Sequence, residues 1–118
     1  MLKKGKLPSY ADGIIAIYRE KPNSTSFGAK INASSVDDMD LVVTLAYSAQ
    51  SIRERDFDFA EQMGFNLSAK MKTHFVRGVA SDCKAVIENN LYDISYIDKT
   101  KTEMFFYLEG GVPLVDSR

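Results

Sequence analysis

The period of the hydrophobic pattern changes twice between residues 41 and 75, and no other feature of the chain constrains its fold as strongly. Across residues 41–48 apolar side chains recur at every second position, as in a strand with one buried face and one partly covered face. Residues 51–63 show helical spacing, and residues 65–75 return to strict alternation. This pattern predicts a strand, a helix of about three turns and a second strand.

Signals at both ends support the predicted helix. Ser51 and Glu54 have the spacing of a capping box, in which Ser51 is the N-cap and the glutamate reaches back to it. Gly64 follows the last periodic position, where glycine adopts the left-handed conformation of a helix C-terminus at little cost. The apolar face of this helix is expected to consist of Ile52, Phe59, Ala60 and Met63.

The rest of the chain contains short apolar runs that are typical of strands. A run over residues 13–19 is apolar on both faces, which predicts cover on both sides. An Asn-Asn pair separates two further runs and favours a tight hairpin, because asparagine tolerates a positive φ. The further strands are expected at residues 83–87, 91–97 and 104–108, with Tyr92, Ile94 and Tyr96 on one face.

The predicted fold is therefore mainly β: a small, partly closed β-barrel or sandwich of about six strands, with one short α-helix inserted between strands. With 118 residues, the chain is expected to form a single domain that spans residues 1–118. The composition of residues 1–10 predicts a mobile arm and that of residues 20–40 a long loop. Residues 110–118 are expected to form a C-terminal tail, since two glycines and a proline end the last apolar run.

Composition narrows the possible environments and partners. Fifteen basic and sixteen acidic side chains give a net charge of −1, so any contact with nucleic acid must be local. Cys83 is the only cysteine, which excludes an intrachain disulfide and fits a reducing compartment. No apolar run approaches the length of a membrane span, so we expect a soluble protein made in a cytoplasm, without a membrane partner.

Catalytic and metal sites have little support in the residue pattern. Asp37, Asp38 and Asp40 could supply loop oxygens to calcium, but they lack the spacing of an EF-hand, and a solvated or partner-facing acidic patch is the alternative. His74 is the only histidine and falls on the outward face of a predicted strand. The chain has no glycine-rich phosphate loop. We therefore expect no enzymatic activity, no metal and no cofactor.

The central and C-terminal residues resemble the head-closure, or stopper, proteins of long-tailed bacteriophages, which are also described as head-tail adaptor or joining proteins. The shared pattern is a Ser-Ile segment, a polar stretch, an acidic residue followed by Phe, then Ala and Gly, and later a hairpin and an aromatic-rich strand. In this chain the pattern is carried by Ser51-Ile52, residues 53–55, Asp56-Phe57, Ala60, Gly64, residues 86–94 and residues 104–108. The resemblance covers about residues 41–109.

This resemblance implies a virion structural protein of the head-tail connector, made in the cytoplasm of the bacterial host. Such proteins form a homo-oligomeric ring, commonly of about twelve copies, beneath the portal and adaptor proteins. The ring closes the DNA channel, contacts the genomic DNA non-specifically and offers tail proteins their attachment surface. A tail terminator or another neck ring protein is the alternative within the virion. Outside it, the alternative is a free-standing nucleic-acid-binding β-barrel, with Tyr92, Tyr96 and Tyr107 as a stacking platform.

A stripe of basic residues is the candidate for contact with DNA in the channel. In a ring these charges would be repeated around the channel and could hold phosphates without reading sequence. We therefore expect residues 72–82 to face the channel, although in a monomer a solvated strand face explains the same stripe. The stripe consists of Lys70, Lys72, His74, Arg77 and Lys84.

A second set of residues is expected to contact a neighbouring subunit or another protein. Asp56 interrupts the apolar helical face, where a buried carboxylate without a partner would cost several kcal/mol. A neighbouring subunit could supply that partner, or an exposed helix edge could allow local pairing. The predicted contact set is Arg53, Arg55, Asp56, Phe27, Asp37 and Asp38.

Overall fold

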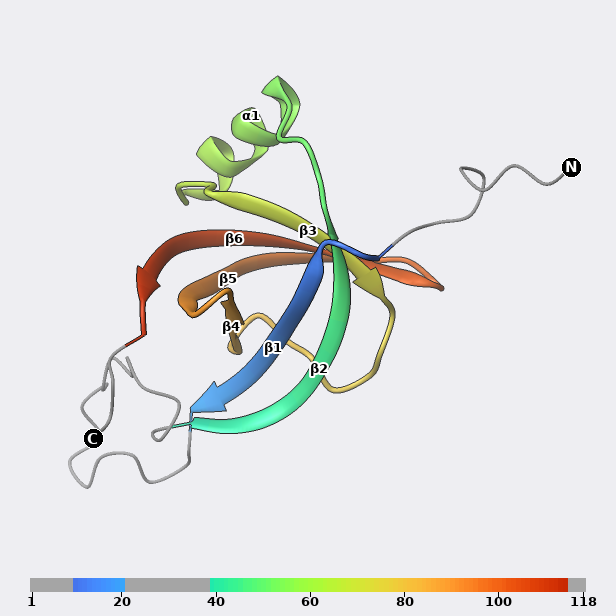
Figure 1. The fold of residues 1–118 in the computed structure, drawn as a ribbon. Helices are drawn as coiled ribbons and strands as arrows, with labels where there is room; N and C mark the ends of the chain where they lie inside the picture. The colour runs from blue at the N-terminus through green and yellow to red at the C-terminus, as the bar shows by residue number, and fades with distance from the viewer. Residues whose placement is uncertain (1–9, 21–38, 115–118) are drawn as a thin grey trace, which may run out of the picture.

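The computed structural model describes residues 10–20 and 39–114, in which one helix and six strands are present (Figure 1). The elements are β1 (Gly13–Glu20), β2 (Met39–Ala49), α1 (Glu54–Met63), β3 (Ala69–His74), β4 (Lys84–Ile87), β5 (Asn90–Lys99) and β6 (Glu103–Pro113). All strand pairs are antiparallel, and the sheet closes on itself in the order β1-β2-β3-β6-β5-β4. The predicted mainly β fold with one inserted helix is confirmed.

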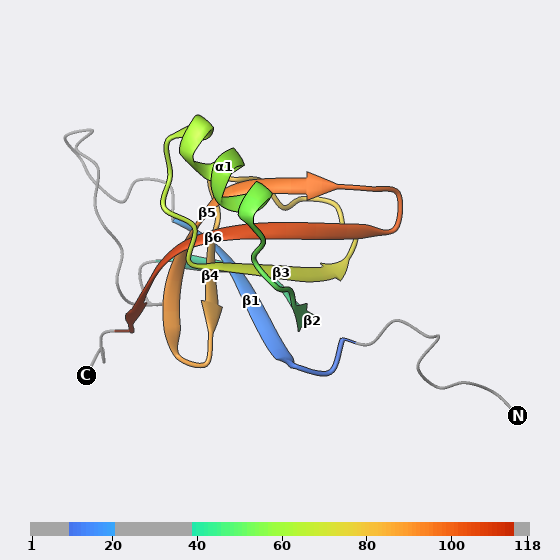
Figure 2. The ribbon, with the colours of Figure 1, turned by 90° about the horizontal axis from the view of Figure 1, so that it is seen from above.

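The helix lies on the outer face of one side of this ring of strands. Figure 2 shows β3, β6 and β5 running side by side beneath α1, while β1 crosses below them at a steep angle. The strands β2 and β3 share the fewest residue pairs in the ring: only Ser48 pairs with Lys72 and Ala49 with Met71. The chain leaves the sheet at this seam to form α1 and returns to it as β3.

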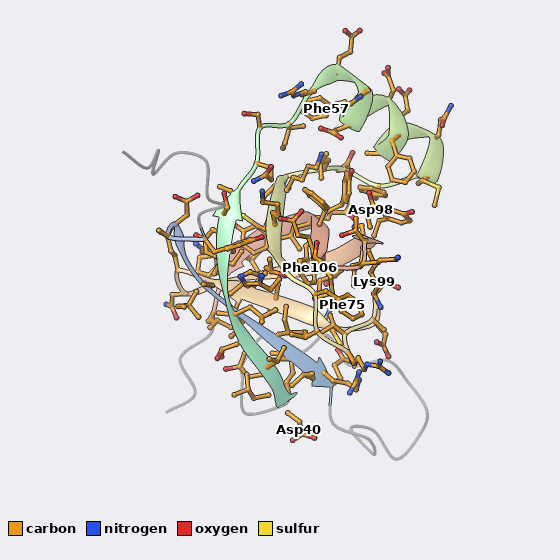
Figure 3. The ribbon with its side chains drawn as sticks, turned by 90° about the vertical axis from the view of Figure 1, so that its right-hand side faces the viewer. Asp40, Phe57, Phe75, Asp98, Lys99 and Phe106 are labelled. Carbon is orange, nitrogen blue, oxygen red and sulfur yellow. The ribbon has the colours of Figure 1, made fainter. Side chains whose placement is uncertain are left out.

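The core fills the interior of the ring. Ile15, Ile17, Met104, Phe106 and Leu108 are all fully buried, and Phe106 lies in the middle of the strands in Figure 3. Because side chains alternate along a strand, the neighbours of these residues in β1 and β6 point outward. In β6 the outward face is partly covered by α1, but in β1 it is not, and Ile14 is 58% exposed. The prediction that the first strand is covered on both sides is therefore wrong.

The helix begins two residues later than predicted. Arg53, rather than Ser51, is the N-cap, and the Asp56 carboxylate accepts a hydrogen bond from the Arg53 N–H at 2.9 Å. Asp56 and Ala60 are its buried residues, whereas Met63, expected on the apolar face, is 56% exposed. The predicted C-terminus is confirmed, since Gly64 has a φ of 85° and its N–H donates to the Ala60 carbonyl at 2.8 Å.

The strand after the helix is shorter than its sequence pattern predicts. It starts at Ala69 rather than Phe65, because the first residues of the alternating run continue the turn that ends the helix. The Phe65 N–H donates to the Ala60 carbonyl at 2.9 Å, and the Phe65 ring packs against Phe59. From Ala69 onward the expected alternation holds, with Met71 and Thr73 buried.

A bulge in β5 changes which of its side chains face the core. The register with β6 shifts between Ile94 and Tyr96, so Ile94 and Ile97 pack into the core while Tyr96 points outward beneath α1. The prediction that Tyr92, Ile94 and Tyr96 share one face is therefore wrong.

The β4–β5 hairpin is confirmed, with a two-residue turn in which Glu88 and Asn89 have φ values of 51° and 66°. The predicted tail boundary is wrong, because β6 continues to Pro113 and pairs with Asn90. Gly111 lies where the register shifts, and a Cβ there would be 2.8 Å from the Tyr92 ring.

The predicted arm and loop fall mostly outside the described residues. Tyr10, however, is packed against other side chains, and Glu20 and Asp40 belong to β1 and β2.

The two neighbouring phenylalanines of β6 provide a test of the inside-outside assignment. Phe106→Ala is expected to lower the free energy of unfolding by about 3–5 kcal/mol, because it leaves a cavity in the closed core. Phe105→Ala, on the outward face, should cost less than half as much. Urea unfolding of both variants and the wild type measures this difference, and equal losses would contradict the assignment.

Candidate functional site

An ion pair between Asp56 and Lys70 joins α1 to the sheet. The Lys70 ammonium lies 3.2 Å from Asp56 Oδ1, and the side chains are 16% and 6% exposed respectively. The second carboxylate oxygen accepts the Arg53 N–H. Asp56 therefore caps its own helix and attaches that helix to β3, so its partner comes from the same chain and no neighbouring subunit is needed to satisfy it.

The surroundings of Asp56 favour the charged carboxylate. Burial raises the pKa of Asp56, but the Arg53 N–H, the hydrogen bond and charge of Lys70, and the charge of Arg55 outweigh it. The pKa of Asp56 is consequently lower than its ordinary value. Asp56 is ionised at neutral pH, and the ion pair is intact there.

An aromatic cluster lies beside this ion pair and fills the space beneath the helix. The ring centroid of Phe59 lies 4.9 Å from that of Tyr96, edge to face, and 5.7 Å from that of Tyr107, in a tilted arrangement. The Lys70 ammonium lies 5.2 Å from the centroid of Tyr107. Tyr92 packs instead against the interior core. The three tyrosines proposed as a stacking platform therefore do not form an exposed surface.

An open groove of about 700 Å³ lies between the N-terminal turn of α1 and the outer face of the sheet. It begins at the end of β2, where Ala49, Gln50 and Ser51 line it. The predicted contact residues Arg53, Arg55 and Asp56 all line this groove, so the structure brings them together. The other charged and aromatic residues of its lining are Lys70, Asp98, Phe59, Phe105 and Tyr107.

The predicted basic stripe does not form one continuous patch. Lys70, Lys72 and His74 share the outward face of β3, but Lys84 lies on β4, which is on the opposite side of the ring. All three lysines are in ion pairs, with Asp56, Glu103 and Asp93 respectively. Arg77, in the loop after β3, is exposed.

The loop between β3 and β4 is attached to the ring at two points. Arg19 donates a hydrogen bond to the Gly78 carbonyl, and Lys99 donates one to the Val79 carbonyl, both at 3.0 Å. Val79 and Cys83 are each 2% exposed and belong to the core.

A second cluster, formed by Tyr10, Lys72, His74 and Glu103, lies on the outward face of the paired strands β3 and β6. The Tyr10 hydroxyl donates to Glu103 Oε2 at 2.6 Å. The centroids of the Tyr10 and His74 rings are 4.1 Å apart. Lys72 completes the cluster, 3.6 Å from the same carboxylate oxygen. The hydrogen bond to Glu103 raises the pKa of Tyr10, and burial and the carboxylate charge act in the same direction. The same bond lowers the pKa of Glu103, helped by Lys72 and His74 and opposed by burial.

Some of these residues have no signal in the sequence. Tyr10 falls in a segment whose lysines, glycine and proline suggest a mobile arm, and Asp98 falls just after the strand predicted at residues 91–97. The pairing of Asp56 with Lys70 joins residues 14 positions apart, and no local pattern indicates it. Phe27, Asp37 and Asp38 lie outside the described residues.

Within residues 10–20 and 39–114, no three His, Cys, Asp or Glu side chains are close enough together to hold a metal ion. In the same ranges no helix is long and apolar enough to cross a membrane. Comparison of the chain with models of known protein families finds no match, and comparison with curated proteins finds no related sequence.

Removing the charge of Asp56 tests its structural role. Asp56→Asn is expected to lower the free energy of unfolding at pH 7 by about 1–3 kcal/mol, because Lys70 loses its partner in a mostly buried site. Since the pKa of Asp56 is lowered by folding, its contribution is present above the unfolded pKa of about 3.9 and is lost as the pH falls through the folded value.

Urea unfolding at pH 7 and at about pH 2 checks both expectations, because the difference between wild type and variant should shrink in acid. Asp58→Asn, an exposed position on the same helix, is the matched control and should change stability by less than about 0.5 kcal/mol. Equal effects of the two substitutions at neutral pH would show that Asp56 does not hold the helix.

The Tyr10 cluster predicts a measurable pKa change. Tyr10→Phe should raise the pKa of Glu103 toward its ordinary value of about 4.3, because the carboxylate loses its hydrogen-bond donor. Carboxyl carbon chemical shifts followed by NMR during an acid titration measure this pKa. Tyr18→Phe, on β1, is the control, and an unchanged Glu103 pKa in Tyr10→Phe would mean that Tyr10 is not docked in solution.

Proposed function

We propose that the chain is a structural component of the head-to-tail connector of a long-tailed bacteriophage. In this proposal it assembles as a ring beneath the portal and adaptor proteins, closes the DNA channel and provides the surface to which the tail attaches. It is a virion protein made in the host cytoplasm and acts by assembly, without catalytic turnover. The observation that carries the proposal is the position of α1, inserted between β2 and β3 of a six-stranded closed sheet.

The way in which α1 is attached supports a role in assembly. A helix of ten residues that buries only Asp56 and Ala60 gains little stability from its own packing. The Asp56–Lys70 pair and the cluster around Phe59 nevertheless hold it in one place on the sheet. A rigidly held insertion with an adjacent polar groove is suited to docking with a neighbouring protein, since little conformational freedom is lost on binding.

The positively charged surface available to DNA in the channel is smaller than the sequence predicts. Lys70 and Lys72 already pair with carboxylates, so near the channel the predicted stripe retains Arg77, in the β3–β4 loop, and His74, at the end of β3. In a ring, one arginine per subunit still provides a repeated positive charge that could contact phosphates without base recognition. Residues 72–82 are therefore proposed to face the channel, with Arg77 as their main contact.

A tail terminator is the second candidate, since it would use the same ring architecture at the other end of the neck. The free-standing nucleic-acid-binding barrel is not favoured by the geometry, because Tyr96 and Tyr107 pack beneath α1 and Tyr92 packs into the core.

Deleting the gene from the phage that encodes this chain distinguishes these functions. For a head-closure protein we expect DNA-filled heads that lose their genome and remain without tails, seen by electron microscopy, with normal tails accumulating separately. Free tails of irregular length would instead indicate the terminator. Infectious virions of normal appearance would contradict a connector role, and restoring the wild-type gene in trans is the control.

A further inference from the structure

The groove beside α1 carries positive charge that the fold leaves unpaired. Arg53 and Arg55 are both exposed, and neither forms an ion pair with a described residue. Asp56 forms its ion pair with Lys70, and its other oxygen accepts the Arg53 N–H, so neither guanidinium is paired with this carboxylate. Asp98 is the remaining carboxylate of the lining. Two guanidinium groups against one carboxylate favour an anionic occupant.

The walls of the groove indicate what kind of anion it fits. Phe59 and Phe105 are half-buried and supply apolar surface next to the arginines. This combination suits a carboxylate side chain that is followed by an apolar one. A DNA backbone is a poorer match, because Glu54, Asp58 and Glu61 are exposed on the same helix and would repel a continuous row of phosphates.

Such a carboxylate lies at the far end of β2. Asp40 and Leu41, at the start of the strand, are exposed, and Leu41 has 56% of its surface accessible. The other end of the same strand, at Ala49, opens into the groove. Figure 3 shows Asp40 at the opposite pole of the molecule from the helix that carries Phe57. The basic residue opposite Asp40 in register, Arg19, donates to the Gly78 carbonyl.

We propose that the Asp40–Leu41 end of one copy docks in the groove of the next copy, with Asp40 facing Arg53 and Arg55 and Leu41 against Phe105. This contact joins two different surfaces at opposite ends of the molecule, so it is heterologous and propagates from subunit to subunit. A ring closes when the rotation between neighbours allows it. The inference rests on the proposed ring function, for which it specifies the subunit interface.

Cysteine cross-linking tests the contact directly. Leu41→Cys and Ser51→Cys place one thiol at each end, while the native Cys83 is buried. After mixing at about 1 mM, where even a weak interface is populated, mild oxidation with copper phenanthroline should give mainly the mixed disulfide dimer. The double variant should give a ladder of oligomers. Absence of the mixed dimer, or an excess of either homodimer, would overturn the proposal.

Charge-reversal substitutions distinguish this contact from cross-linking by random collision. Arg55→Glu and Asp40→Arg are each expected to reduce the initial rate of mixed-dimer formation about tenfold, since like charges then face each other. Placing Arg55→Glu on one partner and Asp40→Arg on the other should restore it to within about threefold of the original rate. Lys101→Glu, in the exposed β5–β6 turn, is the charge-matched control and should have no effect. No loss from the single reversals, or no restoration, would count against the pairing.

Other occupants of the groove give different results. If excess duplex DNA protects the Ser51→Cys thiol from alkylation and an excess of the wild-type chain, whose only cysteine is buried, does not, the groove binds nucleic acid and the proposal is wrong. Failure of the proposed function is recognised separately: mixed dimers with normal virions after gene deletion would leave the contact standing without the connector role. A ring in the virion that is cross-linked only through other residues would support the connector role and overturn the proposed contact.

Discussion

The ion pair between Asp56 and Lys70 is the interaction on which the outer surface of this protein depends. Without it, α1 would be a short helix with two buried residues, held on the sheet only by the aromatic cluster around Phe59. With it, the carboxylate that caps the helix also attaches the helix to β3. Because that carboxylate is nearly buried, losing its partner would leave an unpaired charge in a poorly solvated site. Positions of α1 that separate Asp56 from Lys70 are therefore unfavourable.

The same pairing determines the charge of the surface beside it. Lys70 is neutralised by Asp56 and is removed from the set of groups available to a partner, whereas Arg53 and Arg55 are not. The outward face of β3 is likewise less basic than its lysines suggest, since Lys72 pairs with Glu103. A count of basic residues along a strand therefore overestimates the positive charge that a phosphate would meet.

Much of the fold follows from local patterns in the chain. The change of hydrophobic period indicates the strand-helix-strand unit, Gly64 indicates where the helix ends, and the Asn-Asn pair indicates the β4–β5 hairpin. The start of the helix could not be predicted in the same way, because local preference favours Ser51 over Arg53 as the N-cap. In the structure Arg53 is the N-cap, and Asp56, which accepts its N–H, also pairs with Lys70 from a distant strand.

The sequence by itself determined the number, type and order of the elements, because periodicity and capping depend on residues a few positions apart. Only the tertiary structure decided which side chains meet across the ring. The β5 bulge turns Tyr96 toward the helix, Tyr10 joins Glu103 from a distance of 93 residues, and closure of the sheet places Lys84 opposite Lys70. These contacts join segments far apart along the chain, so their free energy depends on how the strands pair and close, and no local window of sequence contains it.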